Sequence, residues 1–169
     1  MGRLLQKATR RLTRTVGKHR LFRLLSLYPP YLGAGIRVTA VSKDLRTIDV
    51  AMRLGHLNQN YVGTQFGGSL YSMCDPFLML ILIENLGPDF VVWDKAAHIR
   101  FLKPGRGTVR ARFEVSAERI DEIRQAAEHG KVEPEFEVEV TDASGEAVAR
   151  VHKTLYVRRK DGAPTSPGS

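Results

Sequence analysis

Short segments of alternating hydrophobic and polar residues recur along the chain, and this pattern is typical of strands with one buried face. In one of them Ile48, Val50 and Met52 alternate with polar or small residues. Because short turns separate most of these segments, we expect them to pair as antiparallel strands. Strands are predicted at residues 36–42, 47–53, 91–103, 108–116, 136–141 and 146–159.

A different pattern occupies residues 69–86, which are apolar almost all round and end at Gly87-Pro88. This stretch predicts one long helix buried on every side. Residues 117–130 are polar and predict a short connecting helix. A helix that is apolar all round needs a sheet wrapped about it and a second subunit to cover the remainder. The pattern therefore predicts an α+β domain, an antiparallel sheet around one long central helix, that assembles with copies of itself.

The basic charge of the chain is confined to its beginning. The formal net charge is +8, yet residues 1–43 carry 10 basic residues and no acid, so the rest of the chain sums to −2. We expect residues 1–28 to form a basic amphipathic helical arm, 29–160 the domain, and 161–169 a disordered tail. The arm could pack on the domain, lie on an anionic membrane surface, or serve as a transit peptide. It lacks the aromatic platform of a nucleic-acid binder, and no nucleic acid is expected.

Few residues suit metal or redox chemistry. A single cysteine, Cys74, excludes an intramolecular disulfide and favours a reducing compartment, so we expect a cytoplasmic protein, with the arm as a contact to the membrane periphery. The five histidines lack the spacing of metal ligands, and glycine patterns for phosphate or dinucleotide loops are absent from the sequence. No metal and no separate cofactor is expected.

The chemistry is expected where the predicted central helix begins. Gly67-Gly68 would let a ligand approach the backbone, and the unpaired N–H of Gly67 could polarise a carbonyl as an oxyanion hole. Asp75 follows eight residues later, about 12 Å along a helix, so it could not serve that carbonyl within its own chain. An alternative interpretation makes Asp75 the N-cap of a second helical segment, with Pro76 as its first residue.

The motif resembles a known family. The run Asn60-Tyr-Val-Gly-Thr-Gln-Phe66-Gly67-Gly68, followed by Asp75, is similar to the pattern Asn-x-x-Gly-x-x-His-Gly-Gly plus an acid in hotdog-fold acyl-CoA thioesterases of the phenylacetate-pathway type. The resemblance extends to the uncharacterised hotdog group DUF4442 and covers roughly residues 28–160. Its landmarks lie in residues 29–35, 75–76, 92–95 and 101–105.

The resemblance implies how the site would work. Asp75 would face Gly67 across a two-fold subunit interface and act as nucleophile or general base, and Asn60 would orient the water or the carboxylate. The protein would be a homodimer or a dimer of dimers. Phe66 stands where the family has His, so one polar contact is lost.

These implications define an expected substrate and an alternative function. The expected function is hydrolysis of an acyl-CoA, with coenzyme A as part of the substrate; the alternative is a non-catalytic acyl-CoA or lipid-binding hotdog protein. The apolar helix suggests an apolar acyl chain. Lys103 and Arg106 flank a turn where hotdog proteins often hold the coenzyme A phosphates. The predicted substrate-binding residues are Phe66, Gly68, Met79, Lys103 and Arg106.

Asp94 and Lys95 are adjacent on a predicted strand. We expect them either to pair with each other or to line the pocket.

Overall fold

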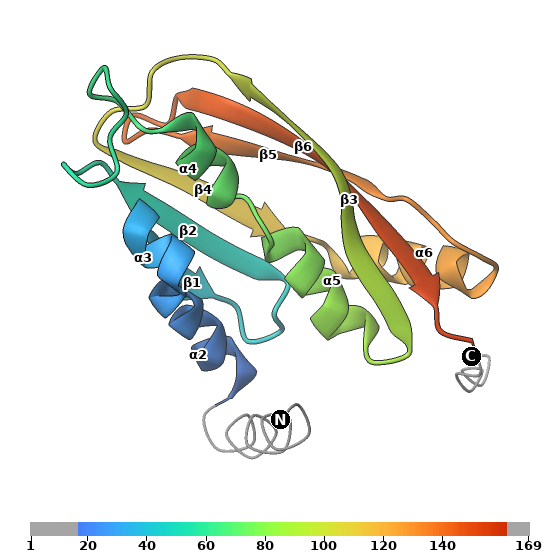
Figure 1. Ribbon diagram of the computed structural model, residues 1–169. Helices are drawn as coiled ribbons and strands as arrows, with labels where there is room; N and C mark the ends of the chain where they lie inside the picture. The colour runs from blue at the N-terminus through green and yellow to red at the C-terminus, as the bar shows by residue number, and fades with distance from the viewer. Residues whose placement is uncertain (1–16, 162–169) are drawn as a thin grey trace.

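The computed structural model describes residues 17–161 (Figure 1). Its strands form one six-stranded sheet in the order β1-β2-β4-β5-β6-β3, and every neighbouring pair is antiparallel. The predicted strands are confirmed with shifts of at most two residues at their ends. Their bounds are β1 Ile36–Val41, β2 Thr47–Arg53, β3 Phe90–Phe101, β4 Thr108–Glu114, β5 Glu135–Thr141 and β6 Ala147–Arg159.

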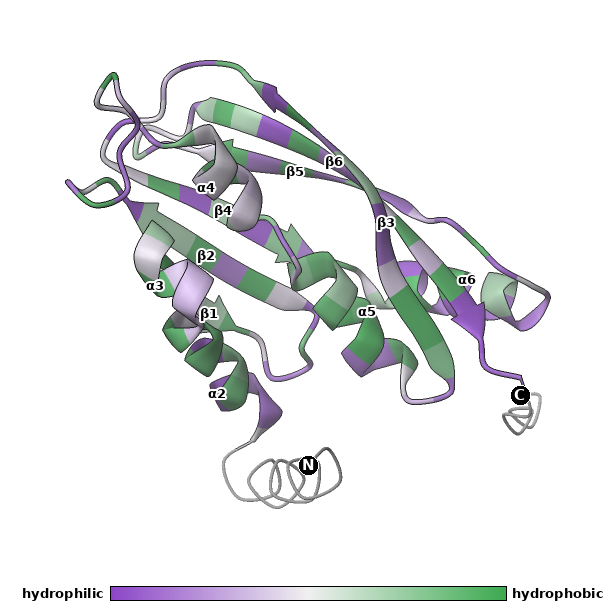
Figure 2. Ribbon diagram, in the orientation of Figure 1, coloured by the Kyte–Doolittle hydropathy of each residue, from purple (hydrophilic) through white to green (hydrophobic). Residues whose placement is uncertain are grey.

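The apolar face of the sheet forms the core together with two helices, α4 (Gly67–Ser72) and α5 (Phe77–Leu86), which lie across it in Figure 1. Figure 2 shows the alternation of hydrophobic and hydrophilic positions along the strands. At the centre, the rings of Phe77 and Phe113 lie 5.0 Å apart between centroids, and Tyr31 packs on Phe77 at 6.0 Å. Aromatic pairs at these distances add to the free energy of burying their surface.

The predicted central helix extends from Gly67 to Leu86, but it is interrupted at residues 73–76. Pro76 has no backbone N–H to donate and disfavours helical geometry in the residue before it, so α4 ends and α5 starts anew at Phe77. The burial is also incomplete, because Ile83 is 38% exposed. This segment is long and apolar enough to cross a membrane, yet here it packs against a curved sheet as a core helix.

A third helix, α6 (Ala117–Glu128), joins β4 to β5 where a polar connector was predicted. It begins at Ser116, whose side-chain oxygen accepts a hydrogen bond from the Arg119 N–H at 3.1 Å. Three apolar side chains are buried under it: Ile120, Ile123 and Ala127. The helix is therefore amphipathic and closes one end of the core.

Short helices cover the β1 edge of the sheet: α2 (Lys18–Arg23), the 3-10 helix η1 (Leu24–Leu27) and α3 (Pro29–Ala34). The Arg23 guanidinium donates to the carbonyl of Thr39, and the Val38 N–H donates to the Ser26 hydroxyl at 2.9 Å. The second half of the predicted arm thus packs on the domain. The predicted helix over residues 1–16 and the tail from 162 lie outside the described residues.

We expect Gly35→Ala to destabilise the fold. Gly35 ends α3 with φ +73°, and a Cβ there would lie 2.8 Å from Asn58 Nδ2. That nitrogen donates to the carbonyls of Ala34 and Arg53, so it cannot move aside without losing hydrogen bonds. The strain of alanine in a left-handed backbone conformation and the lost hydrogen bonds should together lower the free energy of unfolding by about 2 kcal/mol. Urea unfolding measures this change.

Gly33→Ala is the matched control, because Gly33 lies within α3 and a Cβ there would contact nothing within 4 Å. Alanine favours helix, so this variant should be as stable as the wild type or slightly more so. Equal losses of unfolding free energy in Gly33→Ala and Gly35→Ala would contradict the role assigned to Gly35.

Candidate functional site

A buried lysine lies at the break in the central helical segment. Asp75 occupies the junction between α4 and α5, and its carboxylate Oδ1 accepts a hydrogen bond from Lys153 Nζ at 2.9 Å. Lys153 comes from the middle of β6, and its side chain is 0% exposed, whereas that of Asp75 is 44% exposed. A buried ammonium therefore holds a carboxylate that solvent and ligands can still reach.

Asp94 of β3 contributes a second carboxylate, with Oδ1 2.7 Å from Lys153 Nζ. Burial raises the pKa of Asp94, the lysine opposes that rise, and the neighbouring Asp75 carboxylate adds to it. Burial lowers the pKa of Lys153, but the two carboxylates more than offset this and the net change is upward. The cluster is thus one protonated lysine shared by two carboxylates in unequal environments, an arrangement found where acid and base roles are separated.

Lys153 was not among the residues predicted for the site. The signal was in the alternation of β6, where Val151, Lys153 and Leu155 occupy successive inward positions and are all buried. A lysine is almost never fully buried unless paired, so its inward register predicts nearby carboxylates.

The interpretation of Asp75 as a helix N-cap is wrong. The residue flanking α5 is Pro76, and the helix end has no side-chain cap. The backbone of Asp75 is instead held from α3, because the Tyr31 hydroxyl donates to the Asp75 carbonyl. Burial, followed by the charge of Asp75, raises the pKa of Tyr31 well above its usual value, so the hydroxyl stays protonated as a donor.

Aromatic rings enclose the glycine pair at the start of α4. A Cβ on Gly67 would lie 3.0 Å from Cζ of Phe101, and one on Gly68 would lie 2.5 Å from Cε1 of Phe66. Both rings are more than half exposed. Phe66 flanks the helix and provides no side-chain cap. The glycines therefore make room for two rings, and the N–H of Gly67 as an oxyanion hole stays a prediction.

Asn60 uses its side chain within its own loop. Its Nδ2 donates to the Thr64 hydroxyl at 2.8 Å and to the Gln65 carbonyl at 3.3 Å. Its Oδ1 accepts from the N–H groups of Val62 and Thr64 at 3.1 and 2.9 Å. Asn60 thus fixes the loop that leads into the glycine pair, and orienting a water would compete with these bonds.

Lys103 lies at the predicted phosphate-binding turn, but carboxylates surround its ammonium. Asp142 Oδ2 is 2.7 Å from Nζ, and Glu146 is also in contact. The hydrogen bonds of these two acids raise the pKa of Lys103. Arg106, on the same turn, is exposed, and Met79 of α5 is half-buried.

Of the two alternatives for Asp94 and Lys95, pairing with each other is wrong, and both residues line a hollow instead. The register of β3 shifts between Asp94 and Ala96, so Lys95 lies at an irregularity of the strand and has no partner in the ladder. Asp94 contacts Lys153, whereas Lys95 donates to Glu133 at 2.5 Å. Within residues 17–161, His, Cys, Asp and Glu side chains form no group of three that could hold a metal ion.

We expect alkaline pH to destabilise the protein through Cys74, which is buried beside the cluster. Burial raises the pKa of its thiol from 9.0 to about 12. Above pH 9 the unfolded chain releases this proton and the folded chain retains it. The free energy of unfolding should therefore fall by up to about 1.4 kcal/mol per pH unit between pH 9 and about 12.

Urea unfolding at successive pH values from about 8 to 10 measures this slope. Tyr31, whose pKa is also raised, adds a decline of the same sign at higher pH. Cys74→Ala removes the thiol, so its slope just above pH 9 should be shallower than that of the wild type. An identical slope would contradict the assignment.

The profile of the domain of unknown function DUF4442 matches residues 17–157. The chain belongs to the DUF4442 family. A search of curated proteins finds no match.

Several solved structures similar to this DUF4442 protein carry thioesterase names. A protein of unknown function from Pseudomonas aeruginosa, PA5026, named a probable thioesterase, has TM-score 0.74 and 25% identity, covering 83% of this chain and 95% of that one. Thioesterase HI1161 from Haemophilus influenzae has TM-score 0.64 and 15% identity, with coverages of 87% and 94%.

The E. coli PaaI protein from the phenylacetic acid degradation operon is similar at TM-score 0.58 and 18% identity, covering 88% of this chain and 98% of its own. The predicted hotdog fold of the DUF4442 protein is thereby confirmed, and PA5026, the neighbour at 25% identity, supports a function of thioesterase type.

Proposed function

We propose that this protein hydrolyses an acyl-CoA thioester, with Asp75 as nucleophile or general base. The observation that carries the proposal is the Asp75 carboxylate, which is 44% exposed and bonded to the buried Lys153 ammonium. A base or nucleophile must be ionised and accessible to its substrate. The Lys153 ammonium fixes one carboxylate oxygen by a hydrogen bond at 2.9 Å, and the exposed part of the side chain leaves room for a water or an acyl carbon.

The proposed step needs only this carboxylate and backbone donors. Asp75 takes a proton from water as that water attacks the acyl carbon, or attacks the carbon itself to give an acyl-enzyme that water then cleaves. The Gly67 N–H at the uncapped start of α4 stabilises the developing oxyanion. Coenzyme A leaves as its thiolate and is then protonated, and no further cofactor takes part.

We propose that Asp75 of one copy completes the site at Gly67 of a second. Seven residues, 68–74, separate the two positions along the chain, and the first five of them belong to α4, which keeps Asp75 away from a carbonyl held at its own Gly67. The open edge of β3 supports such an assembly, because Trp93 and Phe101 are 63% and 57% exposed there. An uncovered strand edge readily pairs with another copy. A dimer, or a dimer of dimers, is proposed on this basis.

Release of free coenzyme A from a panel of short- to long-chain acyl-CoAs, followed with a thiol reagent, tests the function. Turnover on some chain length supports it and defines the substrate class. No turnover on any member of the panel, with acyl-CoA still bound in calorimetry, would establish the alternative of a binding protein. Two observations favour that alternative: Phe66 lacks the polar atoms of the family His, and Asn60 is occupied in its loop.

A further inference from the structure

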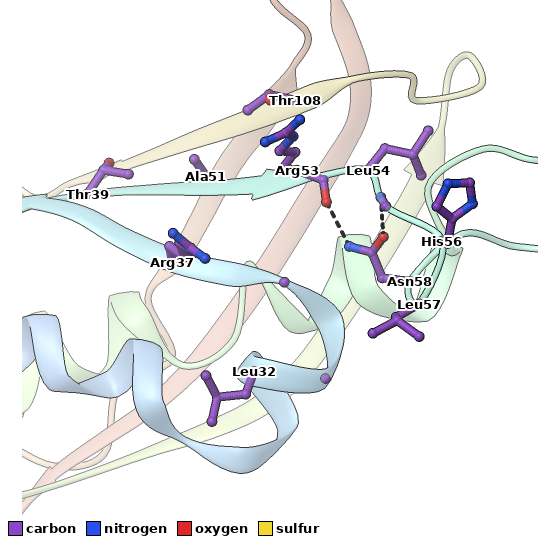
Figure 3. A pocket seen from close by; sticks show the side chains of 13 residues that line it. Leu32, Arg37, Thr39, Ala51, Arg53, Leu54, His56, Leu57, Asn58 and Thr108 are labelled. Atoms are coloured by element: carbon purple, nitrogen blue, oxygen red, sulfur yellow. Dashed lines mark hydrogen bonds between the residues drawn. The ribbon is translucent and has the colours of Figure 1, made fainter.

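Two adjoining hollows lead from the outer face of the sheet to the start of α4. The first has a volume of about 850 Å³ and is lined by β1, β2, the end of α3 and residues 54–58 (Figure 3). The second, about 400 Å³, shares Gly33, Leu57 and Asn58 with the first. It continues to Phe66, Gly68 and Ser69. An extended ligand could therefore reach from one to the other.

The first hollow, which we call the arginine groove, contains Arg37 of β1 and Arg53 of β2. Ala51 lies opposite Arg37 in the ladder and two residues before Arg53, so both guanidinium groups flank one small side chain on the same face. Neither guanidinium takes part in an ion pair formed within residues 17–161. Two arginines on the same face of neighbouring strands, neither of them in an ion pair among the described residues, favour an anion between them.

The wall between the hollows is held firmly. Asn58 Oδ1 accepts from the Gly55 N–H at 2.7 Å, and Nδ2 donates to the carbonyls of Ala34 and Arg53 at 2.7 and 2.8 Å. Figure 3 shows two of these bonds, from the Gly55 N–H and to the Arg53 carbonyl. The passage is thus formed before any ligand arrives, which lowers the entropic cost of binding.

We propose that the arginine groove binds the phosphate groups of coenzyme A, while the pantetheine arm follows the second hollow to α4. This inference rests on the proposed function and specifies its substrate as a coenzyme A ester. Coenzyme A has anionic phosphates at one end, a neutral extended middle and the thioester at the other end. The two joined hollows match that order. Lys103, the cation expected at the phosphates, is neutralised by Asp142 and Glu146.

The test compares Arg37→Gln/Arg53→Gln with wild type on an acyl-CoA and on the acyl-pantetheine of the same chain, which lacks the nucleotide phosphates. The KM for acyl-CoA should rise about tenfold or more, because hydrogen bonds to charged groups are lost. The kcat should stay unchanged, and so should the KM for acyl-pantetheine. Equal KM values for acyl-CoA, or equal rises for both esters, would overturn the proposal.

Arg20→Gln/Lys43→Gln is the matched control: it removes the same charge from exposed residues outside both hollows and should leave every constant unchanged. A rise in KM as large as in the groove variant would also overturn the proposal.

Failure of the proposed function is distinguishable from failure of the groove. If the wild type cleaves neither ester, calorimetry with coenzyme A still tests the groove. A Kd for coenzyme A that rises in Arg37→Gln/Arg53→Gln, and not in the control variant, supports the arginine groove as the phosphate site. An unchanged Kd, or no binding to the wild type, overturns it.

Discussion

Asp75→Asn is expected to lower kcat for acyl-CoA hydrolysis by at least about 100- to 10,000-fold, the range for removing a positioned general base. Asparagine has nearly the same shape as aspartate, but it can neither take a proton from water nor form an acyl-enzyme. Lys153 keeps Asp94 as a partner in the variant, so the fold should survive. Free-thiol release measures the loss, circular dichroism checks the fold, and affinity for coenzyme A should be largely intact.

Asp94→Asn is the matched control for this variant, because it removes the other carboxylate from the same ammonium. Burial and the nearby Asp75 raise the pKa of Asp94, which makes it a poorer candidate for an ionised base, and it is less exposed than Asp75. We expect a much smaller loss of kcat. If kcat fell sharply in Asp94→Asn and was retained in Asp75→Asn, Asp94 rather than Asp75 would be the base or nucleophile.

Lys153→Met is expected to destabilise the protein by about 3 kcal/mol, the lower end of the cost of breaking a buried ion pair. Methionine fills much of the space but leaves Asp75 and Asp94 close together without their shared cation. The cost is moderated because the Asp75 side chain is 44% exposed and water can screen it. Urea unfolding near neutral pH measures the change.

Lys103→Met provides a close comparison, because Lys103 also contacts two carboxylates. Its side chain is 31% exposed, against 0% for Lys153. Solvent screens exposed pairs, so this variant should change stability little. If Lys103→Met were as destabilising as Lys153→Met, burial of Lys153 would not be the source of its effect.

The six strands and the helical segments after residue 66 follow from local pattern, and the sequence alone was sufficient for them. Alternation placed all six strands, because side chains on a strand face opposite sides of the sheet in turn. The apolar stretch ending at Gly87 identified the central helical segment. Its break was a local effect too, since Pro76 cannot continue a helix, and the alternative interpretation of a second helical segment at Pro76 anticipated it.

The motif from Asn60 to Asp75 was likewise visible in the chain, and so were the two glycines. The sequence also limited the chemistry, since one cysteine and scattered histidines offer no thiolate cluster or metal-ligand spacing.

What only the tertiary structure decided is which charges meet. Lys153 lies 78 residues from Asp75 along the chain, and their contact depends on how β6 lies against the helical break. The same holds for Lys103, whose partners come from the β5–β6 turn, and for the two arginines of the groove, which strand register brings to one face. Local propensity acts over a few residues, whereas ion pairs act through space, so the sequence determined the elements and the packing of the sheet determined the site.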